Sequence, residues 1–339
     1  MKKGVAFFLW SLLASVLLVG CGTTSTSEEN SESGKAAGDF KLKKDVEFIC
    51  PFSAGGGSDL YARMAADIIQ KNGWCDQPIM VVNKTGGGGS VGDTYTFSKK
   101  GSSETITTYV SAQITSAMLN KTEVTYKDLT PICNLAMDEY LIGVNADSPY
   151  QTAEDLMKAS KENPGSITVG GSGKGTEDEL VTGMMNKYGD AQFEYVSYNS
   201  SSEVMSAMLG GHITAGIYNP NECLSQAEAG QVSLLAAFGP ERVSILPEIS
   251  TFTELGYPDI VFQQFRGIFG APEMSEEAVT YWADVFKKVT EDNEWKEKYL
   301  DSNGLTSKYI AGEDFETFLG GEAEKYETDF DASMDDDFN

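Results

Sequence analysis

The chain has 339 residues, of which 41% are hydrophobic and 22% charged, so it can bury a large core, and global disorder is excluded. Its 51 acidic residues against 25 lysines and arginines give a formal charge of −26, which excludes nucleic acid as a partner, because phosphates require clustered cations. His212 is the single histidine, so we expect no histidine-rich metal site, and we expect no cofactor.

The N-terminus has the features of an export signal. Two lysines precede an apolar run over residues 5–19, which is shorter than the roughly 20 residues of a membrane span. The run ends in Leu18-Val19-Gly20-Cys21, which resembles a bacterial lipobox. We therefore expect residues 1–20 to be a lipoprotein signal peptide and Cys21 to be lipidated. Ordinary signal cleavage with a free Cys21 is the alternative.

The segment after the signal has almost nothing to bury. Residues 21–39 are mostly Ser, Glu, Gly, Thr and Asn, which predicts a disordered tether. Signal and tether together predict an extracytoplasmic protein that a lipid anchors to a bacterial membrane, in the periplasm or on the outer cell surface. The excess of acidic residues favours solubility away from the lipid surface.

Strand and helix patterns alternate along the rest of the chain. The expected strands cover residues 46–50, 79–82, 105–110, 141–144, 167–169, 213–217 and 234–237. The expected helices cover residues 60–71, 177–188 and 276–300, with another from residue 313 and a frayed acidic end over 329–339. This alternation predicts an α/β protein with mostly parallel, doubly wound sheets.

Three loops rich in glycine and serine follow strand or strand-like segments, at residues 53–58, 86–92 and 170–176. In doubly wound folds, ligands bind where strand ends meet helix N-termini. Glycine lets backbone N–H groups approach a ligand closely, and helix N-termini favour anions. The loops therefore predict a site that holds an anion with neutral groups. The alternative is that they are ordinary turns.

The cysteines give no metal or redox motif, because none of them forms a CxxC pair. One disulfide in an exported protein and a set of buried thiols are the alternatives. The residues concerned are Cys50, Cys75, Cys133 and Cys223.

One catalytic alternative stays open. Residues 88–92 match the Gly-x-Ser-x-Gly pattern of serine hydrolases, with Ser90 as nucleophile and His212 as the base. The same glycine run also matches a dinucleotide-binding pattern, but the acidic residue expected about 20 positions later is missing. Two unrelated matches to one run make each of them weak evidence, and we do not expect an enzyme.

Short motifs match one receptor family in the same order along the chain. Pro51-Phe52-Ser53-Ala54-Gly55-Gly56-Gly57-Ser58-Asp59, with Arg63, resembles the signature of the solute-binding proteins of tripartite tricarboxylate transporters. Asn83-Lys84-Thr85-Gly86-Gly87-Gly88 resembles the second loop of that family, and Gly171-Ser172-Gly173-Lys174-Gly175-Thr176 resembles a later ligand loop. Further motifs carry the resemblance over about residues 43–328.

The resemblance implies a two-lobed periplasmic-binding-protein fold of type II, with two crossovers between the lobes, near residues 138–145 and 234–262. Residues 40–142 and 259–339 would form the first lobe, and residues 143–258 the second. Ligands of the family are small carboxylates, which main-chain amides, hydroxyls and bridging waters hold.

Carried over position by position, the resemblance also implies a ligand site. The first lobe would contribute Ser53, Ala54, Gly56, Ser58, Asp59, Gly87 and Ala112, and the second Ser172, Thr176, Tyr198 and Asn219. Arg266 would be the one cation near a carboxylate, with a salt bridge at the hinge as its alternative. Asp59 is open between a ligand contact and a helix N-cap. Departures at Ser197, Asn199 and Phe265 leave the identity of the ligand undecided.

The sequence thus predicts a monomeric, lipid-anchored receptor that closes over a small organic anion and delivers it to membrane permease subunits. The rival hypotheses are an exported serine hydrolase and a ligand sensor that informs a two-component kinase. Di- and tricarboxylates, amino acids and aromatic acids all remain candidate ligands.

Overall fold

A computed structural model describes residues 40–334, and the surroundings of side chains up to residue 329. The predicted signal peptide (1–20), the lipidation site Cys21, the tether (21–39) and residues 335–339 lie outside the described residues. Between residues 40 and 334, no helix is long and apolar enough to cross a membrane.

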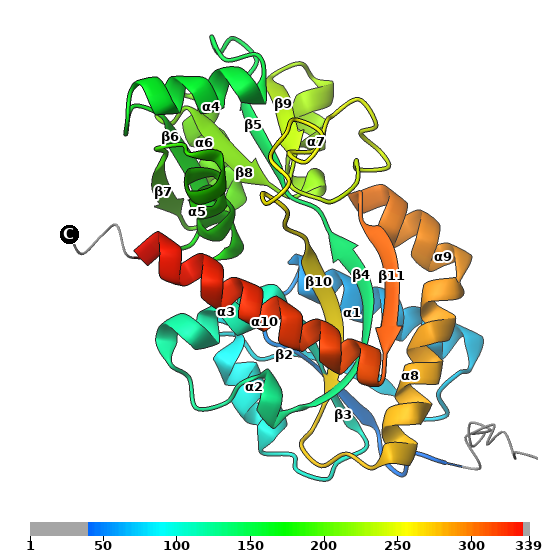
Figure 1. Ribbon diagram of the computed structural model, residues 1–339. Coiled ribbons are helices and arrows are strands. Elements are labelled where there is room, and N and C mark those ends of the chain that lie inside the picture. Colours follow the sequence, from blue (N-terminus) through cyan, green and yellow to red (C-terminus); the bar gives the residue numbers. More distant parts are fainter. Residues whose placement is uncertain (1–39, 335–339) are drawn as a thin grey trace, which may run out of the picture. The chain divides into compact units, whose positions relative to one another are not determined.

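The first of two sheets has six strands in the order β11-β4-β10-β3-β1-β2 (Figure 1). Strand β1 pairs in parallel with β2 and β3, while β10 runs antiparallel to β3 and β4, and β11 antiparallel to β4. The strands are β1 (Val46–Cys50), β2 (Ile79–Asn83), β3 (Thr105–Val110), β4 (Thr130–Asp138), β10 (Gln264–Gly270) and β11 (Thr306–Ala311).

The second sheet has five strands in the order β7-β6-β8-β5-β9. Strand β6 pairs in parallel with β7 and β8, while β5 runs antiparallel to β8 and β9. The strands are β5 (Leu141–Asn145), β6 (Thr168–Ser172), β7 (Glu194–Tyr198), β8 (Ala215–Tyr218) and β9 (Val232–Ala237). The chain enters this sheet between β4 and β5 and leaves it between β9 and β10, so it crosses twice, as predicted.

Helices cover both sheets. Those connected to the six-stranded sheet are α1 (Gly57–Asn72), α2 (Ser90–Phe97), α3 (Ser111–Asn120), α8 (Glu276–Glu291), α9 (Asn293–Trp295) and α10 (Glu313–Met334). Those connected to the five-stranded sheet are α4 (Ala153–Glu162), α5 (Glu177–Gly189), α6 (Ser201–Leu209) and α7 (Pro220–Glu228). Single 3-10 turns lie at Gly87–Gly89 and Tyr126–Asp128, and a short π-helix at Lys296–Asp301. In Figure 1, α10 runs from the six-stranded sheet to α5 beside the five-stranded sheet, and these two helices are in contact.

Buried side chains join the two sheets. One hydrophobic cluster contains Tyr109 and Phe265 from the six-stranded sheet together with Ile142 and Val169 from the five-stranded sheet. A second cluster lies where α1 and α8 pack on β1, around Phe48 and the fully buried Trp282. A third lies under α6 and α7. The core is therefore continuous from one sheet to the other.

The α/β class is confirmed, but the sheets are mixed rather than mostly parallel. The difference arises where the chain changes sheets. Strand β4 leads out towards the second sheet and β10 returns from it, so as neighbours they run in opposite directions. The start of β10 at Gln264 pairs with the end of β4 at Asp138, so the chain leaves and returns at the same end of this pair.

Local patterns placed most elements correctly. The strands over 46–50 and 105–110 are confirmed to the residue. The prediction of a frayed end from residue 329 is wrong up to residue 334, because α10 continues to Met334 and buries Asp329. The expected helix over 276–300 is broken at Asp292, where α8 ends and a new turn begins.

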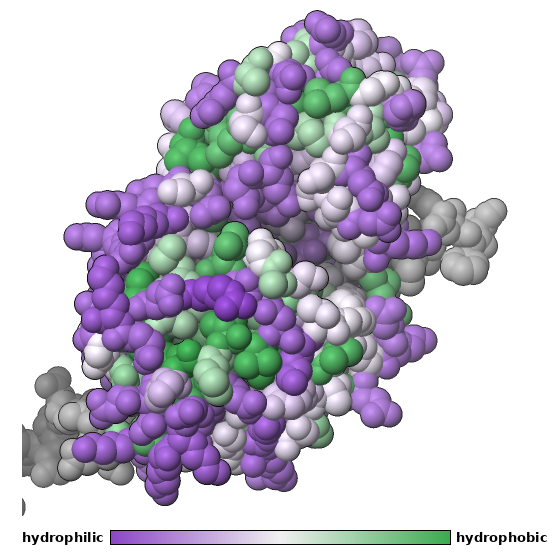
Figure 2. All heavy atoms as spheres, turned by 180° about the vertical axis from the view of Figure 1, so that it is seen from behind, coloured by the Kyte–Doolittle hydropathy of each residue, from purple (hydrophilic) through white to green (hydrophobic). Residues whose placement is uncertain are grey.

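The cysteines and the surface complete the fold. All four cysteines in the described part of the chain are free and buried, which favours the buried-thiol alternative. Seen from behind in Figure 2, hydrophilic side chains cover most of the visible face, and hydrophobic ones form separate small groups.

Candidate ligand-binding site

The first predicted loop joins β1 to α1. Ser53, Ala54 and Gly56 are exposed, and the Gly56 amide closes a turn on the Ser53 carbonyl at 3.2 Å. Gly56 is the N-cap of α1 and makes no side-chain cap. Ser58 is buried in the first turn of the helix. The loop is thus exposed over residues 53–56 and becomes buried only where α1 begins.

Asp59 holds this loop in shape. Its Oδ2 accepts hydrogen bonds from the Gly55 amide at 2.8 Å and from Arg63 Nε at 2.9 Å, while Asn83 Nδ2 donates to Oδ1 at 2.8 Å. Burial by itself raises the pKa of Asp59, but these hydrogen bonds, first those from Arg63, outweigh it and leave the pKa below its usual value. Asp59 is therefore an ionised clamp of the loop, and it is not the N-cap.

Arg266, on β10, lies against the same loop. Its Nη2 donates to Asp138 Oδ2 on β4, and the two side chains are 8% and 4% exposed. A methyl group placed on Gly57 would lie only 3.1 Å from that Nη2, so the guanidinium contacts the first turn of α1. The ion pair proposed as the alternative role of Arg266 is thus present, at the position where the family resemblance places the ligand.

The second loop and the start of α3 lie beside each other. Gly87 is exposed and has a φ of +58°, in the left-handed region that favours glycine. Gly88 and Gly89 lie so close to Ser116 and Gln113 of α3 that a methyl group on either would clash. Ala112, in the first turn of α3, faces the start of α5, since its backbone amide acts on the carboxyl of Glu177.

The glycine loop of the five-stranded sheet is closed by its own carboxylates. Asp178 Oδ2 accepts from the Ser172 amide at 2.6 Å and from the Ser172 hydroxyl at 2.9 Å. Glu179 Oε2 accepts from the Gly175 amide at 2.5 Å. Thr176 is the N-cap of α5, although its hydroxyl bonds to Gly173 rather than to the helix. The backbone amides predicted to bind a ligand anion thus already donate to two carboxyl groups of the protein, Asp178 and Glu179.

Tyr198 ends β7 and Asn219 follows β8, the two strands on either side of β6. Tyr198 pairs with Ser172 across the strands, but its ring packs on Gly170 and is partly buried against the core of that sheet. Asn219 is the N-cap of α7, and its Nδ2 donates to the Glu139 carbonyl, at the chain crossing, at 2.8 Å. Its amide donates to Glu222 at 2.9 Å.

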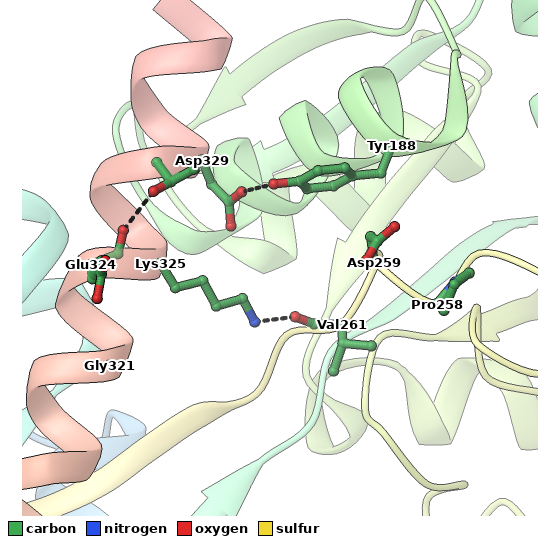
Figure 3. Close-up of a pocket in the computed structure, with 9 residues that line it drawn as sticks. Tyr188, Pro258, Asp259, Val261, Gly321, Glu324, Lys325 and Asp329 are labelled. Carbon is green, nitrogen blue, oxygen red and sulfur yellow. Dashed lines mark hydrogen bonds between the residues drawn. The ribbon is translucent and has the colours of Figure 1, made fainter.

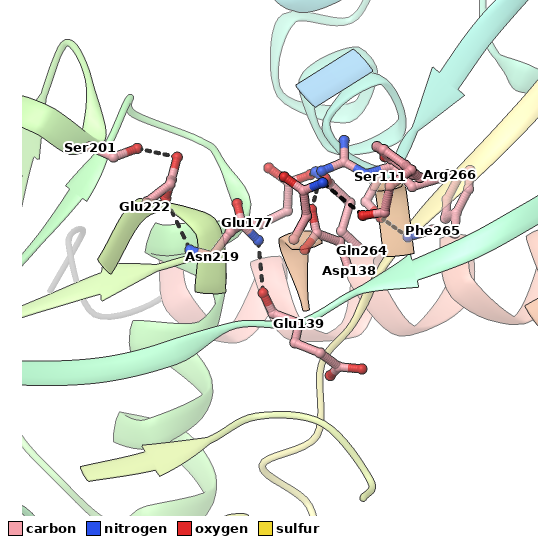
Figure 4. Close-up of polar contacts among 12 residues, drawn as sticks. Ser111, Asp138, Glu139, Glu177, Ser201, Asn219, Glu222, Gln264, Phe265 and Arg266 are labelled. Carbon is pink, nitrogen blue, oxygen red and sulfur yellow. Dashed lines mark hydrogen bonds and ion pairs between the residues drawn. The ribbon is translucent and has the colours of Figure 1, made fainter. Parts of the chain in front are cut away.

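A chain of acidic groups runs across the junction of the two sheets (Figure 4). Glu222 accepts from Ser201 at one end, and Asp138 meets Arg266 at the other. Between them, Glu177 Oε1 accepts from Gln264 Nε2 of β10 at 2.7 Å. Together with Asp178, the site therefore contains one arginine and four carboxyls, which come from elements of both sheets.

Burial dominates the titration of these carboxyls. It raises the pKa of Asp178 to about 8, and the charges of Glu222 and Glu177 add to the rise. Burial also raises the pKa of Glu177, of Glu222 and of Asp138, where the Arg266 charge opposes it only in part. Carboxyls with strongly shifted pKa values are concentrated at functional sites of proteins.

A separate pocket of about 520 Å³ lies where α10 passes α5 (Figure 3). Its only lining cation, Lys325, is bonded to the Val261 carbonyl, and Asp329 accepts from the Tyr188 hydroxyl at 2.6 Å. None of the predicted site residues lines this pocket. We therefore place the candidate site at the junction of the sheets.

Two other chemistries find little support. In the described part of the chain, no group of three or more His, Cys, Asp and Glu side chains could hold a metal ion. Ser90 packs against Gly87 beside the six-stranded sheet, whereas His212 packs against Gly210 beside the five-stranded sheet. The geometry thus gives Ser90 no imidazole partner among the described contacts.

Comparison with known proteins decides the family. The model of the tripartite tricarboxylate transporter family receptor matches residues 61–329. The chain belongs to this family. It is 28% identical over 269 residues to a Cupriavidus necator protein from the gbd 5′ region, covering 78% of this chain and 80% of the relative.

Solved structures agree on the fold of this receptor. A TctC solute-binding protein from Polaromonas, solved without ligand, has a TM-score of 0.74 and 24% identity, over 85% of this chain and 98% of that one. An R. palustris protein solved with adipate has a TM-score of 0.72 and 21% identity, over 86% and 97%. The family consists of solute-binding receptors rather than enzymes, which removes the hydrolase alternative.

Sequence reasoning missed the acidic half of the site. Glu177 and Asp178 follow the third glycine loop directly, so an acidic pair at a helix start was visible. Asp138, Glu222 and Gln264 carried no local signal, because only the sheet order and the chain crossings bring them together.

Proposed function

We propose that the chain is a lipid-anchored, extracytoplasmic receptor that binds a small organic carboxylate between two lobes and passes it to membrane permease subunits. The lobes would be residues 40–142 with 259–339, and residues 143–258. The membership of the receptor family carries this proposal. The adipate bound to the R. palustris relative supports a carboxylate as the ligand.

The carboxylate would bind at the start of α1. The amides of Gly57 and Ser58 are in the first turn of a helix, where no intrahelical carbonyl is available to them. They carry the positive end of the helix dipole, and the Arg266 guanidinium lies against Gly57. Residues 53–56, which are exposed, would close over the ligand.

Thermal unfolding of the purified full chain with di- and tricarboxylates tests this proposal. A ligand that binds only the folded state adds about 2.7 kcal/mol of stability at a hundredfold excess over its dissociation constant. We expect a rise in melting temperature with at least one acid, and a weaker rise in Arg266→Lys. Unchanged melting with every acid, in a protein that unfolds cooperatively, would contradict it.

The anchor is tested separately in cells. We expect a labelled fatty acid to be incorporated into the parent chain and lost in Cys21→Ser, with the variant released from the membrane fraction. Incorporation that survives the substitution would remove Cys21 as the anchor and leave the receptor function untouched.

A further inference from the structure

The five-stranded side of the site carries buried acidic side chains without basic partners. Glu177 and Asp178, at the start of α5, are 4% and 7% exposed, and Glu222 is half-buried in the first turn of α7. In the part of the chain that the structure describes, no lysine or arginine forms an ion pair with any of the three. Their hydrogen bonds come from amides and hydroxyls alone.

On this side of the site, the backbone amides of the loops are not free to bind a ligand anion. The amides of Ser172, Gly175 and Asn219 already donate to Asp178, Glu179 and Glu222. An additional carboxylate here would find these amides occupied and other acidic groups beside it in a poorly solvated space. The six-stranded side has the opposite character, because Arg266 and the first amides of α1 lie there.

Two buried atoms at the boundary are left without partners. Asp138 Oδ1 and Arg266 Nε find no hydrogen bond within residues 40–329, although both residues are more than nine-tenths buried. Figure 4 shows Asp138, Arg266, Glu177 and Glu222 in one group of polar side chains at this boundary. A buried acceptor without a donor is costly, so a donor from the ligand would remove that cost.

We propose that the ligand of this receptor is an amino-carboxylate, with its carboxylate at the start of α1 and its protonated amine facing Asp138, Glu177, Asp178 and Glu222. The inference rests on the proposed receptor function and narrows its substrate class. The ammonium group has three N–H donors, which suit Asp138 Oδ1 and the neighbouring carboxyls. A plain dicarboxylate has no donor to offer them.

Matched pairs of ligands test the proposal by calorimetry on the full chain. The probes are succinate against aspartate, and adipate against 2-aminoadipate, which differ only by the amine. We expect the aminated member of at least one pair to bind at least about tenfold more tightly near neutral pH. Because the amine must meet ionised carboxyls, its binding should release protons, seen as a heat that depends on the buffer.

Substitutions of the carboxyls distinguish a contact with the ligand's amine from a general loss of ligand binding. Glu222→Gln and Asp178→Asn should each erase most of the preference for the amine while plain dicarboxylates bind as well or better. Glu228→Gln, an exposed position near the other end of α7, is the matched control and should change neither. Melting curves check that the variants fold. If Asp178→Asn does not fold, Glu222→Gln alone tests the amine contact.

The outcomes distinguish the two proposals. Equal binding within both pairs, or tighter binding of the plain acids, overturns the amino-carboxylate inference and leaves the carboxylate receptor standing. A preference that persists in Glu222→Gln and Asp178→Asn overturns the assigned contacts. No binding by any of the four probes or by other acids contradicts the proposed function and the inference together.

Discussion

Asp59 shows how one buried side chain can fix the shape of an exposed loop. It is 2% exposed, and it ties the loop amide of Gly55 to Arg63 on the next turn and to Asn83 on β2. Its ionised form has three kinds of donor, so the charge is well satisfied. Sequence alone left its role open, because the partner Asn83 lies 24 positions away.

Replacing Asp59 should therefore loosen both the loop and the fold. We expect Asp59→Ala to lower the free energy of unfolding by about 1–3 kcal/mol, because Gly55 and Asn83 lose a charged acceptor, and to weaken ligand binding. Urea unfolding of the full chain measures the first effect. Asp67→Ala, exposed on the same helix, is the control and should cost little. An Asp59→Ala protein as stable as the parent would refute the clamp.

Asp93, in α2, is a buried carboxyl of the opposite kind. Burial raises its pKa to about 7, although Gln113 Nε2 donates to it at 2.6 Å. The folded state therefore keeps a proton that the unfolded chain releases near pH 4. Stability should fall as pH rises from about 4 to 7, by up to about 1.4 kcal/mol per pH unit, and then level off. The measurement is the free energy of unfolding of Asp93→Asn between pH 4 and 7. We expect the variant to lose the pH dependence that Asp93 causes, and an unchanged pH dependence would contradict the raised pKa of Asp93.

At the scale of elements, two helical glycines of this chain have opposite surroundings. Gly92 is buried in α2, where a Cβ atom would lie 2.8 Å from Pro51 Cβ and 2.9 Å from Pro51 Cα. Gly320, in α10, is exposed and has no atom within 4 Å of the same position. The first glycine lets α2 pack on the end of β1, and the second only weakens its helix.

Alanine at these positions should change stability in opposite directions. We expect Gly92→Ala to destabilise the protein by about 1–3 kcal/mol through overpacking, since backbone of Pro51 must move. Gly320→Ala should stabilise it by about 0.5–1 kcal/mol, the ordinary helix-propensity gain. Urea unfolding of the two variants provides the comparison. Similar effects of both substitutions would argue against the close packing of α2.

At the scale of the whole molecule, Glu139 lies where the chain changes sheets. Gln263, on the returning segment, and Thr306, at the start of β11, donate to its Oε1 at 2.6 and 2.8 Å. Its Oε2 has no partner in the described residues and lies beside Gly239, on the same returning segment as Gln263. Burial raises the pKa of Glu139 to about 7 despite these bonds. One carboxyl thus connects both crossings.

Ionisation of Glu139 at alkaline pH should destabilise the two segments that connect the sheets. We expect Glu139→Gln to raise the melting temperature by a few degrees near pH 8, where the parent must ionise a buried oxygen, and to leave it unchanged near pH 5. Differential scanning calorimetry at both pH values measures this. Glu248→Gln, exposed on the same segment, serves as control. A variant that melts with the parent at pH 8 would disprove the role.

The sequence by itself determined the α/β class, most strands, the three glycine loops and, through colinear motifs, the receptor family. These features depend on neighbours a few positions apart, where periodicity and turn chemistry act. The tertiary structure decided the mixed sheets, the burial of Asp329 and the acidic side of the site. Asp138, Glu177 and Glu222 lie near one another because of the tertiary structure alone. Strand β10 lies between β3 and β4, and its first residue, Gln264, contacts Glu177 at the start of α5. Strand pairing between distant parts of the chain and the burial of polar groups bring these residues together. No pattern among neighbouring residues in the sequence indicates either of them.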